Sequence, residues 1–183
     1  QNSWASSELP LLASGTPIYN CNLAKTEHAA YLLVVNRGAV AGVNYGHSVY
    51  EYKNGTWSIL LNNYVEPNAT QTGIVGLDIE AEENGTLYIL TSDDAVTSGV
   101  YNLRLKKYDP VTKQWSTVGG NPLPLDFKTS TSTSVAISIA PDGTPFVAYR
   151  DEQDQDYPKV IYLDNETKQW SDPHKLADIA SSN

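Results

Sequence analysis

The chain has 183 residues, the length of one ordinary domain or of a small array of repeats, and it can bury a substantial core. Its 21 acidic and 12 basic side chains give a net charge of −9. This charge argues against nucleic-acid and anionic-membrane partners, because both need clustered Lys and Arg. No stretch has the roughly 18–20 apolar residues of a membrane span, and the absence of methionine suggests a processed or excised chain.

The four tryptophans are evenly spaced, with gaps of 53, 58 and 55 residues. They are Trp4, Trp57, Trp115 and Trp170. The string Thr-Lys-Gln-Trp-Ser occurs twice, at 112–116 and at 167–171. A repeat of about 40–55 residues with one tryptophan and several short strands is typical of a propeller or a similar array.

Residues 1–28 are expected to form an N-terminal segment with an outer strand at Trp4, and residues 29–65 the first repeat unit. Alternating apolar residues predict four strands in this unit. These strands are 31–35, 39–43, 48–52 and one that carries Trp57. The predicted turns are Asn36-Arg37-Gly38 and Asn54-Gly55, because Asn and Gly tolerate the positive φ of tight turns.

The second unit, 66–124, and the third, 125–183, follow the same pattern. The second has predicted strands at 76–81, 86–90 and 103–108, a polar loop at 91–99, and the Trp115 strand. The third has predicted strands at 134–140, 145–150 and 159–163, an acidic loop at 151–156, and the Trp170 strand. Asn84-Gly85 and Asp142-Gly143 are the corresponding tight turns.

Period-2 alternation with regular turn signals predicts an all-β protein made of four-stranded antiparallel sheets, about three per chain. The phrase Tyr-Asp-Pro-x-Thr-x-x-Trp at 108–115 and the phrase Asn-Gly-Thr-Leu-Tyr-Ile at 84–89 resemble kelch repeats. The phrase at 140–149 resembles blades of bacterial and fungal propeller lectins. The resemblance implies that each sheet is one blade of a β-propeller.

Three blades are too few to close a ring, since propellers typically have 4–8. We therefore expect a homodimer or a partner chain to complete the propeller, unless the chain is an excised piece of a larger one. The single cysteine, Cys21, cannot form an intrachain disulfide. It is either a small buried hydrophobe, a free thiol or a link between chains.

The sequence gives little sign of catalysis. The histidines have no metal-ligand spacing, and no nucleophile elbow or phosphate loop is present. We expect no catalytic residues, no cofactor and no metal site, and the chain leans towards a non-enzyme. Ca²⁺ at the acidic run from Asp151 to Asp156 is a minor alternative to an ordinary charged loop.

A binding site is more plausible at the loops that follow the second strand of each unit. These loops gather the aromatic, acidic and basic groups that typically hold a sugar. The candidate ligand-binding residues are Asn44, Tyr45, His47, Asp93, Asp94, Tyr149, Arg150 and Asp151. The alternative for each is an ordinary solvated loop residue, and the tryptophans are expected to be wedges between blades rather than ligand platforms.

Four Asn-x-Thr sequons favour a secreted glycoprotein. The acceptors are Asn54, Asn68, Asn84 and Asn165. The functional expectation is a secreted, carbohydrate-binding, lectin-like propeller whose partner is a glycan or glycoprotein. Two alternatives stay open: a protein-binding adhesin or scaffold propeller, and part of a larger propeller enzyme such as a sialidase-like glycosidase.

Overall fold

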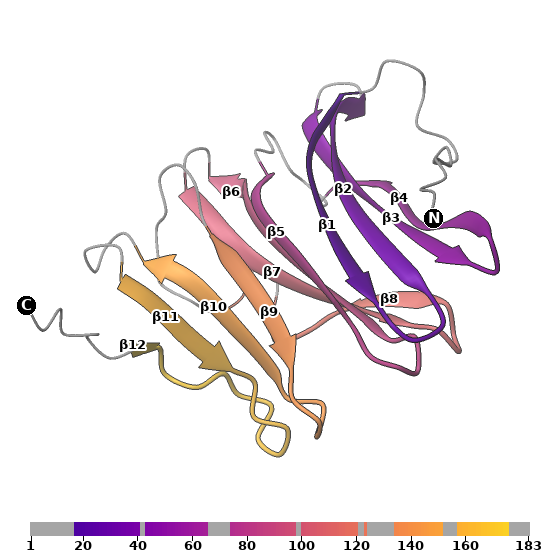
Figure 1. The fold of residues 1–183 in the computed structure, drawn as a ribbon. Coiled ribbons are helices and arrows are strands. Elements are labelled where there is room, and N and C mark those ends of the chain that lie inside the picture. Colours follow the sequence, from indigo (N-terminus) through magenta and orange to yellow (C-terminus); the bar gives the residue numbers. More distant parts are fainter. Residues whose placement is uncertain are drawn as a thin grey trace, which may run out of the picture.

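The structure is a computed structural model that describes residues 17–40, 43–65, 74–97, 100–120, 123, 134–151 and 157–175. Every helix or strand assigned in these ranges is a strand. The strands form three four-stranded antiparallel sheets that lie side by side (Figure 1). This confirms the predicted all-β fold and the predicted number of sheets, while the expected Trp4 strand lies outside the described residues.

The first sheet has the order β1-β2-β3-β4. Its strands are β1 (Ile18–Lys25), β2 (Ala30–Val40), β3 (Val43–Lys53) and β4 (Thr56–Tyr64). Strand β1 thus belongs to the first sheet, whereas residues 1–28 are predicted to be a separate N-terminal segment. The predicted boundaries at 66 and 125 fall outside the described residues.

The predicted turn at Asn36-Arg37-Gly38 is wrong, because β2 runs straight through these residues. Asn36 is fully buried, and its Nδ2 donates to Ser48 Oγ at 3.0 Å and to Asn63 Oδ1 at 2.8 Å. A side chain used in this way holds β2, β3 and β4 together instead of reversing the chain. One 11-residue strand therefore replaces the two short predicted strands.

The second and third sheets repeat this arrangement, with orders β5-β6-β7-β8 and β9-β10-β11-β12. The strands of the second are β5 (Ile74–Ala81), β6 (Leu87–Thr97), β7 (Val100–Asp109) and β8 (Gln114–Thr117). Those of the third are β9 (Val135–Ile139), β10 (Pro145–Asp151), β11 (Tyr157–Tyr162) and β12 (His174–Lys175). The polar loop expected at 91–99 is wrong, since β6 continues to Thr97.

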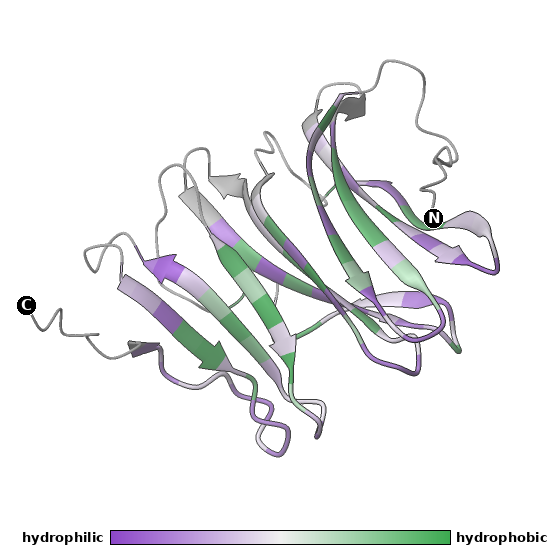
Figure 2. Ribbon diagram, viewed as in Figure 1, coloured by the Kyte–Doolittle hydropathy of each residue, from purple (hydrophilic) through white to green (hydrophobic). Residues whose placement is uncertain are grey.

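Each pair of neighbouring sheets encloses a hydrophobic core. Leu33 and Val49 of the first sheet pack with Ile79 and Leu87 of the second. Leu90 and Leu105, on the other face of the second sheet, belong to a cluster with Val147 of the third. The period of two along each strand produces these two faces, and Figure 2 shows hydrophobic and polar residues alternating along the strands.

Asp78 on β5 connects the innermost strands of all three sheets, because β5 contacts both β1 and β9. Its Oδ1 accepts a hydrogen bond of 2.5 Å from Asn22 Nδ2 on β1. Its Oδ2 accepts one of 2.9 Å from the backbone N–H of Ile137 on β9. One carboxylate therefore sets the separation of three neighbouring sheets near their inner edges.

Trp57, Trp115 and Trp170 occupy equivalent pairing positions, but the strand expected to carry Trp170 is wrong, because the fourth strand of the third sheet, β12, begins at His174. Each lies opposite the end of its sheet's third strand, in the pairs Tyr52↔Trp57, Tyr108↔Trp115 and Leu163↔Trp170. The last pair is an isolated bridge just before β12. All three indoles are half-buried.

Two of these indoles tie one sheet to the sheet before it. Trp115 Nε1 donates to the Leu60 carbonyl on β4 at 3.1 Å. Trp170 Nε1 donates to the Gly119 carbonyl, just beyond β8, at 2.9 Å. These residues are therefore wedges between sheets, as the sequence indicates.

Truncation of Trp115 to Ala should lower the free energy of unfolding by about 3–5 kcal/mol, because it removes a large ring from between two sheets. Trp115→Phe keeps most of the packing but loses the hydrogen bond to Leu60. It should therefore lower the free energy of unfolding by about 1 kcal/mol more than a substitution of an exposed residue does. Urea unfolding measures both. A loss within about 0.5 kcal/mol for the Ala variant, the range of ordinary surface substitutions, would contradict the wedge role.

Asp78→Ala should lower the free energy of unfolding by about 2–4 kcal/mol, since a hydrogen bond to a charged group contributes roughly 1.5–3 kcal/mol. Asp142→Ala is the matched control, because that exposed aspartate accepts its backbone bond from Thr144 within its own turn. Denaturant titration of the two variants compares them. Equal losses would show that Asp78 does not hold the sheets together.

Candidate functional site

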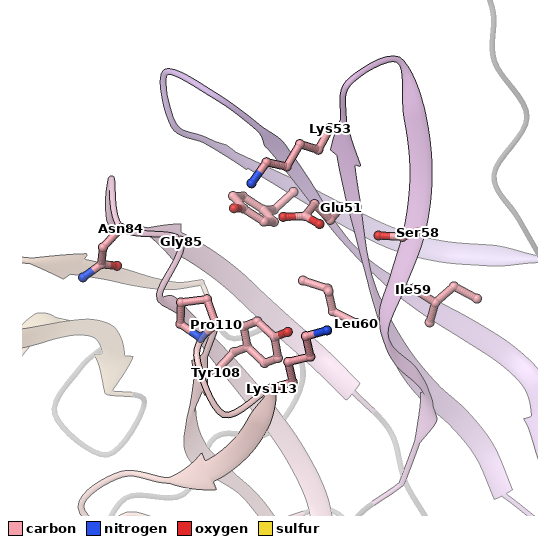
Figure 3. Close-up of a pocket in the computed structure, with 11 residues that line it drawn as sticks. Glu51, Lys53, Ser58, Ile59, Leu60, Asn84, Gly85, Tyr108, Pro110 and Lys113 are labelled. Atoms are coloured by element: carbon pink, nitrogen blue, oxygen red, sulfur yellow. The ribbon is translucent and has the colours of Figure 1, made fainter.

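A pocket of about 560 Å³ opens between the first and second sheets (Figure 3). It lies at the end of the sheets that carries the β3–β4, β5–β6 and β7–β8 turns. The lining residues are Tyr31, Glu51, Lys53, Ser58, Ile59, Leu60, Asn84, Gly85, Tyr108, Pro110 and Lys113. We call it the Tyr–Glu pocket, after Tyr31, Glu51 and Tyr108.

Adjacent strands of the first sheet bring one row of polar groups to this pocket. Tyr31 on β2 pairs with Glu51 on β3, and Glu51 pairs with Ser58 on β4. Directly paired side chains point to the same face of an antiparallel sheet. The row therefore presents a phenol, a carboxylate and a hydroxyl to the second sheet.

Turns of the second sheet form the opposite wall. Gly85 has a φ of 88°, and an added Cβ would lie 3.5 Å from Pro110 and 3.7 Å from the Tyr31 hydroxyl. Lys113 has a φ of 56° and follows Pro110 in the β7–β8 turn. The ring of Tyr108 lies 5.1 Å from that of Trp115, whose bond to Leu60 fixes the separation of the two walls.

The two phenols are held neutral. Burial raises the pKa of Tyr31 to about 12, helped by the nearby negative charge of Glu51 and by a hydrogen bond to that carboxylate. Burial also raises the pKa of Tyr108, and the charges of Glu51 and Asp109 add to this shift. At neutral pH both side chains can therefore donate hydrogen bonds around an acceptor, Glu51.

The equivalent place between the second and third sheets has different chemistry. There the cross-strand row is Tyr88, Lys107 and Ser116, so a lysine stands where the first sheet has Glu51. Leu163, opposite Trp170, takes the place of Tyr108. The Lys107 ammonium lies 5.2 Å from the centroid of the Tyr88 ring. A carboxylate flanked by two phenols is thus present between the first and second sheets but not at the equivalent place between the second and third.

The binding residues predicted from the sequence lie at the other end of the sheets. Residues 44–47, 93–94 and 149–151 are in β3, β6 and β10 rather than in loops, which corrects the expectation. The strands are longer than predicted because their polar residues continue the ladder pairing, for example Asp93 with Asn102. The backbones of Asn44, Asp93 and Asp94 belong to these strands, but their side chains lie outside the described residues.

The other predicted residues contact their own fold. The Tyr45 ring lies 5.1 Å from that of Tyr19, and His47 is buried with its ring 5.2 Å from that of Tyr64. Tyr149 is buried in the core between the second and third sheets, whereas Arg150 is half-buried. Their ligand roles stay predictions.

Asp151 is buried and forms an ion pair of 2.7 Å with Lys159. Residues 152–156, the rest of the acidic run considered for Ca²⁺, lie outside the described residues. In the described ranges no group of three or more His, Cys, Asp or Glu is arranged to hold a metal ion. Cys21 is exposed and is not in a disulfide.

Three of the four predicted glycosylation sites are described, and all are exposed in turns. Asn54 lies between β3 and β4, Asn84 between β5 and β6, and Asn165 after β11. All three are at the end of the sheets where the Tyr–Glu pocket opens. Asn68 lies outside the described residues.

Sequence reasoning missed the residues of the Tyr–Glu pocket. The signal that could have found them is the difference between Glu51 and Lys107 in otherwise equivalent rows. Alignment on the tryptophans hides it, because Glu51 is six residues before Trp57 while Lys107 is eight before Trp115. The β3–β4 turn has two residues and the β7–β8 turn has four, which accounts for the offset.

Comparison of the sequence with protein-family models and with curated proteins found no match. Similar solved structures include an α-L-arabinanase from Penicillium chrysogenum complexed with arabinobiose (TM-score 0.60, 13% identity, 90% of this chain and 52% of that one). A Hadza microbial sialidase has a TM-score of 0.56 and 12% identity, over 90% of this chain and 35% of that one. A fucose lectin from Kordia zhangzhouensis has a TM-score of 0.46 and 12% identity, over 83% of this chain and 96% of that one.

The similarity to the two hydrolases shows a fold of the β-propeller type, and the three sheets are blades of it. They do not single out kelch repeats. The chain spans about a third to a half of the two hydrolases. Separately, the described residues include no helix of the length and apolarity needed to cross a lipid bilayer.

Tyr31 should contribute to stability in a pH-dependent way. Its pKa in the folded chain, about 12, is above the ordinary value of 10, so folding favours the neutral phenol. This contribution is complete below pH 10 and is lost as the pH rises from 10 to about 12. Tyr31→Phe should therefore lose stability less steeply over this range in urea unfolding.

Glu51→Gln should lower the pKa of Tyr31, because the neighbouring negative charge is removed. Absorbance titration at the tyrosinate band, with Tyr31→Phe as the reference for assignment, measures this pKa. A wild-type Tyr31 that titrates near pH 10 would contradict the contact with Glu51.

Proposed function

We propose that this chain is a carbohydrate-binding, lectin-like propeller module and that the Tyr–Glu pocket is its sugar site. The observation that carries the proposal is the Glu51 carboxylate, flanked by two neutral phenols at one sheet boundary and replaced by Lys107 at the other. A pocket of about 560 Å³ is within the usual range for a small ligand.

The pocket offers what a sugar needs. The Glu51 carboxylate, which accepts from the Tyr31 hydroxyl, can accept from a sugar hydroxyl as well, the Tyr31 oxygen can accept from another, and the Tyr108 hydroxyl can donate to a ring or hydroxyl oxygen. The Lys53 and Lys113 ammonium groups add charged donors to the lining. Leu60 and Pro110 supply apolar contact for the C–H groups of the sugar.

Binding is favoured over hydrolysis by the number of carboxylates. Most glycosidases use two carboxyl groups that flank the scissile bond. Among the described residues that line this pocket, Glu51 carries the one carboxylate. The Glu83 charge also raises the pKa of Tyr31, but its Oε2 accepts from the backbone N–H of Glu27. The nearby Asp109 accepts hydrogen bonds from the backbone N–H groups of Val111 and Thr112 within its turn.

Screening of the chain on a glycan array, followed by calorimetry with the sugars that bind, tests this proposal. Glu51→Gln and Tyr108→Leu should each weaken binding about 10- to 100-fold, which corresponds to about 1.4–2.8 kcal/mol, the range expected for a lost hydrogen bond to a charged group. Tyr108→Leu copies the residue found at the equivalent position in the third blade.

Lys107→Gln is the matched control, because it changes the equivalent row without touching the pocket, and it should bind normally. Asp93→Ala and Arg150→Ala test the opposite end of the sheets. If these two substitutions weaken sugar binding and Glu51→Gln does not, the sugar site lies at the opposite end of the sheets. Absence of sugar binding would favour the adhesin or scaffold alternative, and release of reducing sugar would favour the glycosidase alternative.

We also propose that the protein acts outside the cell and that a second copy supplies the blades that complete the ring. The outer face of the first blade exposes Leu23 (61%) and Tyr52 (37%), and that of the third exposes Phe146 (38%). Two copies of three blades would form a ring of six, and these could be kelch-type blades. A two-fold dimer is the commonest symmetric assembly.

Sedimentation equilibrium should therefore find twice the chain mass of 20.0 kDa. Tyr52→Lys and Phe146→Lys should shift the population towards the monomer, because they place charges in the interface. A well-folded wild-type monomer at micromolar concentration would contradict the dimer.

A further inference from the structure

A second groove, of about 560 Å³, lies between the second and third sheets. One wall carries three glutamates from β5 and the turn after it, and the other wall is apolar and precedes β10. The lining residues include Glu80, Glu82, Glu83, Ile139, Ala140 and Pro141. We call it the glutamate groove, and Asn84 lines it as well as the Tyr–Glu pocket.

The side-chain amide of Asn84 is held in one orientation. Its Oδ1 accepts a hydrogen bond of 2.7 Å from the backbone N–H of Thr86, and its Nδ2 donates one of 3.2 Å to Glu82 Oε2. The nitrogen thus lies on the side of the glutamate groove, and in Figure 3 it points away from the Tyr–Glu pocket. Nδ2 is also the atom that carries an N-linked glycan.

The other two described sequons differ from Asn84. Asn165 Nδ2 donates to the Asp142 carbonyl at 3.2 Å and to Thr144 Oγ1 at 2.8 Å, so a sugar there would break one of these bonds. Asn54 lies on a turn whose Gly55 has no atom within 4 Å of an added Cβ. A glycan on Asn54 would therefore extend into solvent.

We propose that Asn84 carries an N-linked glycan and that the glutamate groove holds its first sugar, an N-acetylhexosamine. In the attachment step Asn84 Nδ2 forms a bond to the anomeric carbon of an oligosaccharide carried on a lipid pyrophosphate. The bond from that carbon to the pyrophosphate oxygen breaks, the lipid pyrophosphate leaves with the electron pair, and Nδ2 loses one proton. The remaining Nδ2 hydrogen continues to donate to Glu82.

The groove complements such a sugar. The hydroxyl groups and the acetamido N–H of the sugar are donors, and the carboxylates of Glu80 and Glu82 are acceptors. Glu83 Oε2 instead accepts from the backbone N–H of Glu27 in the β1–β2 turn. The acetyl methyl group and the apolar face of the ring can pack on Ile139 and Pro141. Burial, with the nearby Asp78, raises the pKa of Glu80, so a sugar hydroxyl that donates to this carboxylate would favour its charged form.

The test compares three chains, each produced in a secretory eukaryotic host and in a bacterium that lacks the transferase. Thr86→Val removes the hydroxyl that the sequon needs and keeps Asn84 and the branched shape of residue 86. Thr86→Ser keeps the sequon and is the matched control. The difference in Tm between the two hosts, taken for each chain, cancels the effect of the substitution itself.

Peptide mass should show a glycan on Asn84 in the wild type and in Thr86→Ser but not in Thr86→Val. For the wild type and Thr86→Ser, the Tm of the chain from the eukaryotic host minus that of the bacterial chain should exceed the same difference for Thr86→Val by about 2–4 °C. This is the shift expected for roughly one net hydrogen bond in a chain of this length. Trimming the glycan to its first sugar should keep this gain, because that sugar makes the contacts.

Glu82→Gln should remove much of the gain, whereas Glu166→Gln, an exposed glutamate in the turn after β11, should leave it unchanged. An unmodified Asn84 from the secretory host overturns the proposal. So does a glycan on Asn84 that leaves Tm unaltered, or a gain insensitive to Glu82→Gln. Asn84 also lines the Tyr–Glu pocket, but the readouts are glycan occupancy and Tm rather than binding of an added sugar, so failure of this proposal can be told apart from failure of the proposed sugar binding.

Discussion

The structure depends on hydrogen bonds that run from side chains of one sheet to the main chain of its neighbour. Trp115 reaches back to Leu60 and Trp170 reaches back to Gly119, while Asp78 joins the inner strands. Each sheet satisfies its own ladder, so hydrogen bonds between sheets add direction to the apolar packing. In the described residues the bonds from Lys106 to Tyr64 and from Glu27 to Glu83 also contribute. Gly119 shows how tight the fit is, because a Cβ there would overlap the Trp170 indole.

The Tyr–Glu pocket follows from the same geometry. The tryptophan bond at the outer edge and the Asp78 bonds at the inner edge fix the separation of two sheets, and the side chains between them decide whether the gap is filled. At the second boundary Lys107 lies over Tyr88 and Leu163 packs near Trp170. At the first boundary Glu51 accepts from the Tyr31 hydroxyl, and Lys53 and Lys113 line an open pocket.

Much of the fold could be predicted from the sequence, because tryptophan spacing and Asn-Gly or Asp-Gly turns are local signals. Strand β1 was not predicted although its residues 19–23 alternate, because the usual sides are exchanged: Leu23 is exposed, whereas Asn22 faces the second sheet and bonds to Asp78. Asn36-Arg37-Gly38 has turn composition, yet the buried network of Asn36 keeps it extended. The pocket was hidden because its rows align only through strand register, which the sequence does not state.

Chemical-shift mapping of the ¹⁵N-labelled chain during titration with a glycan that binds tests the central claim most directly. The account predicts that the largest changes lie in the backbone amides of Tyr31, Glu51, Gly85 and Tyr108. Changes confined to residues 45–47 and 149–151, at the opposite end of the sheets, would contradict the assignment of the Tyr–Glu pocket as the sugar site.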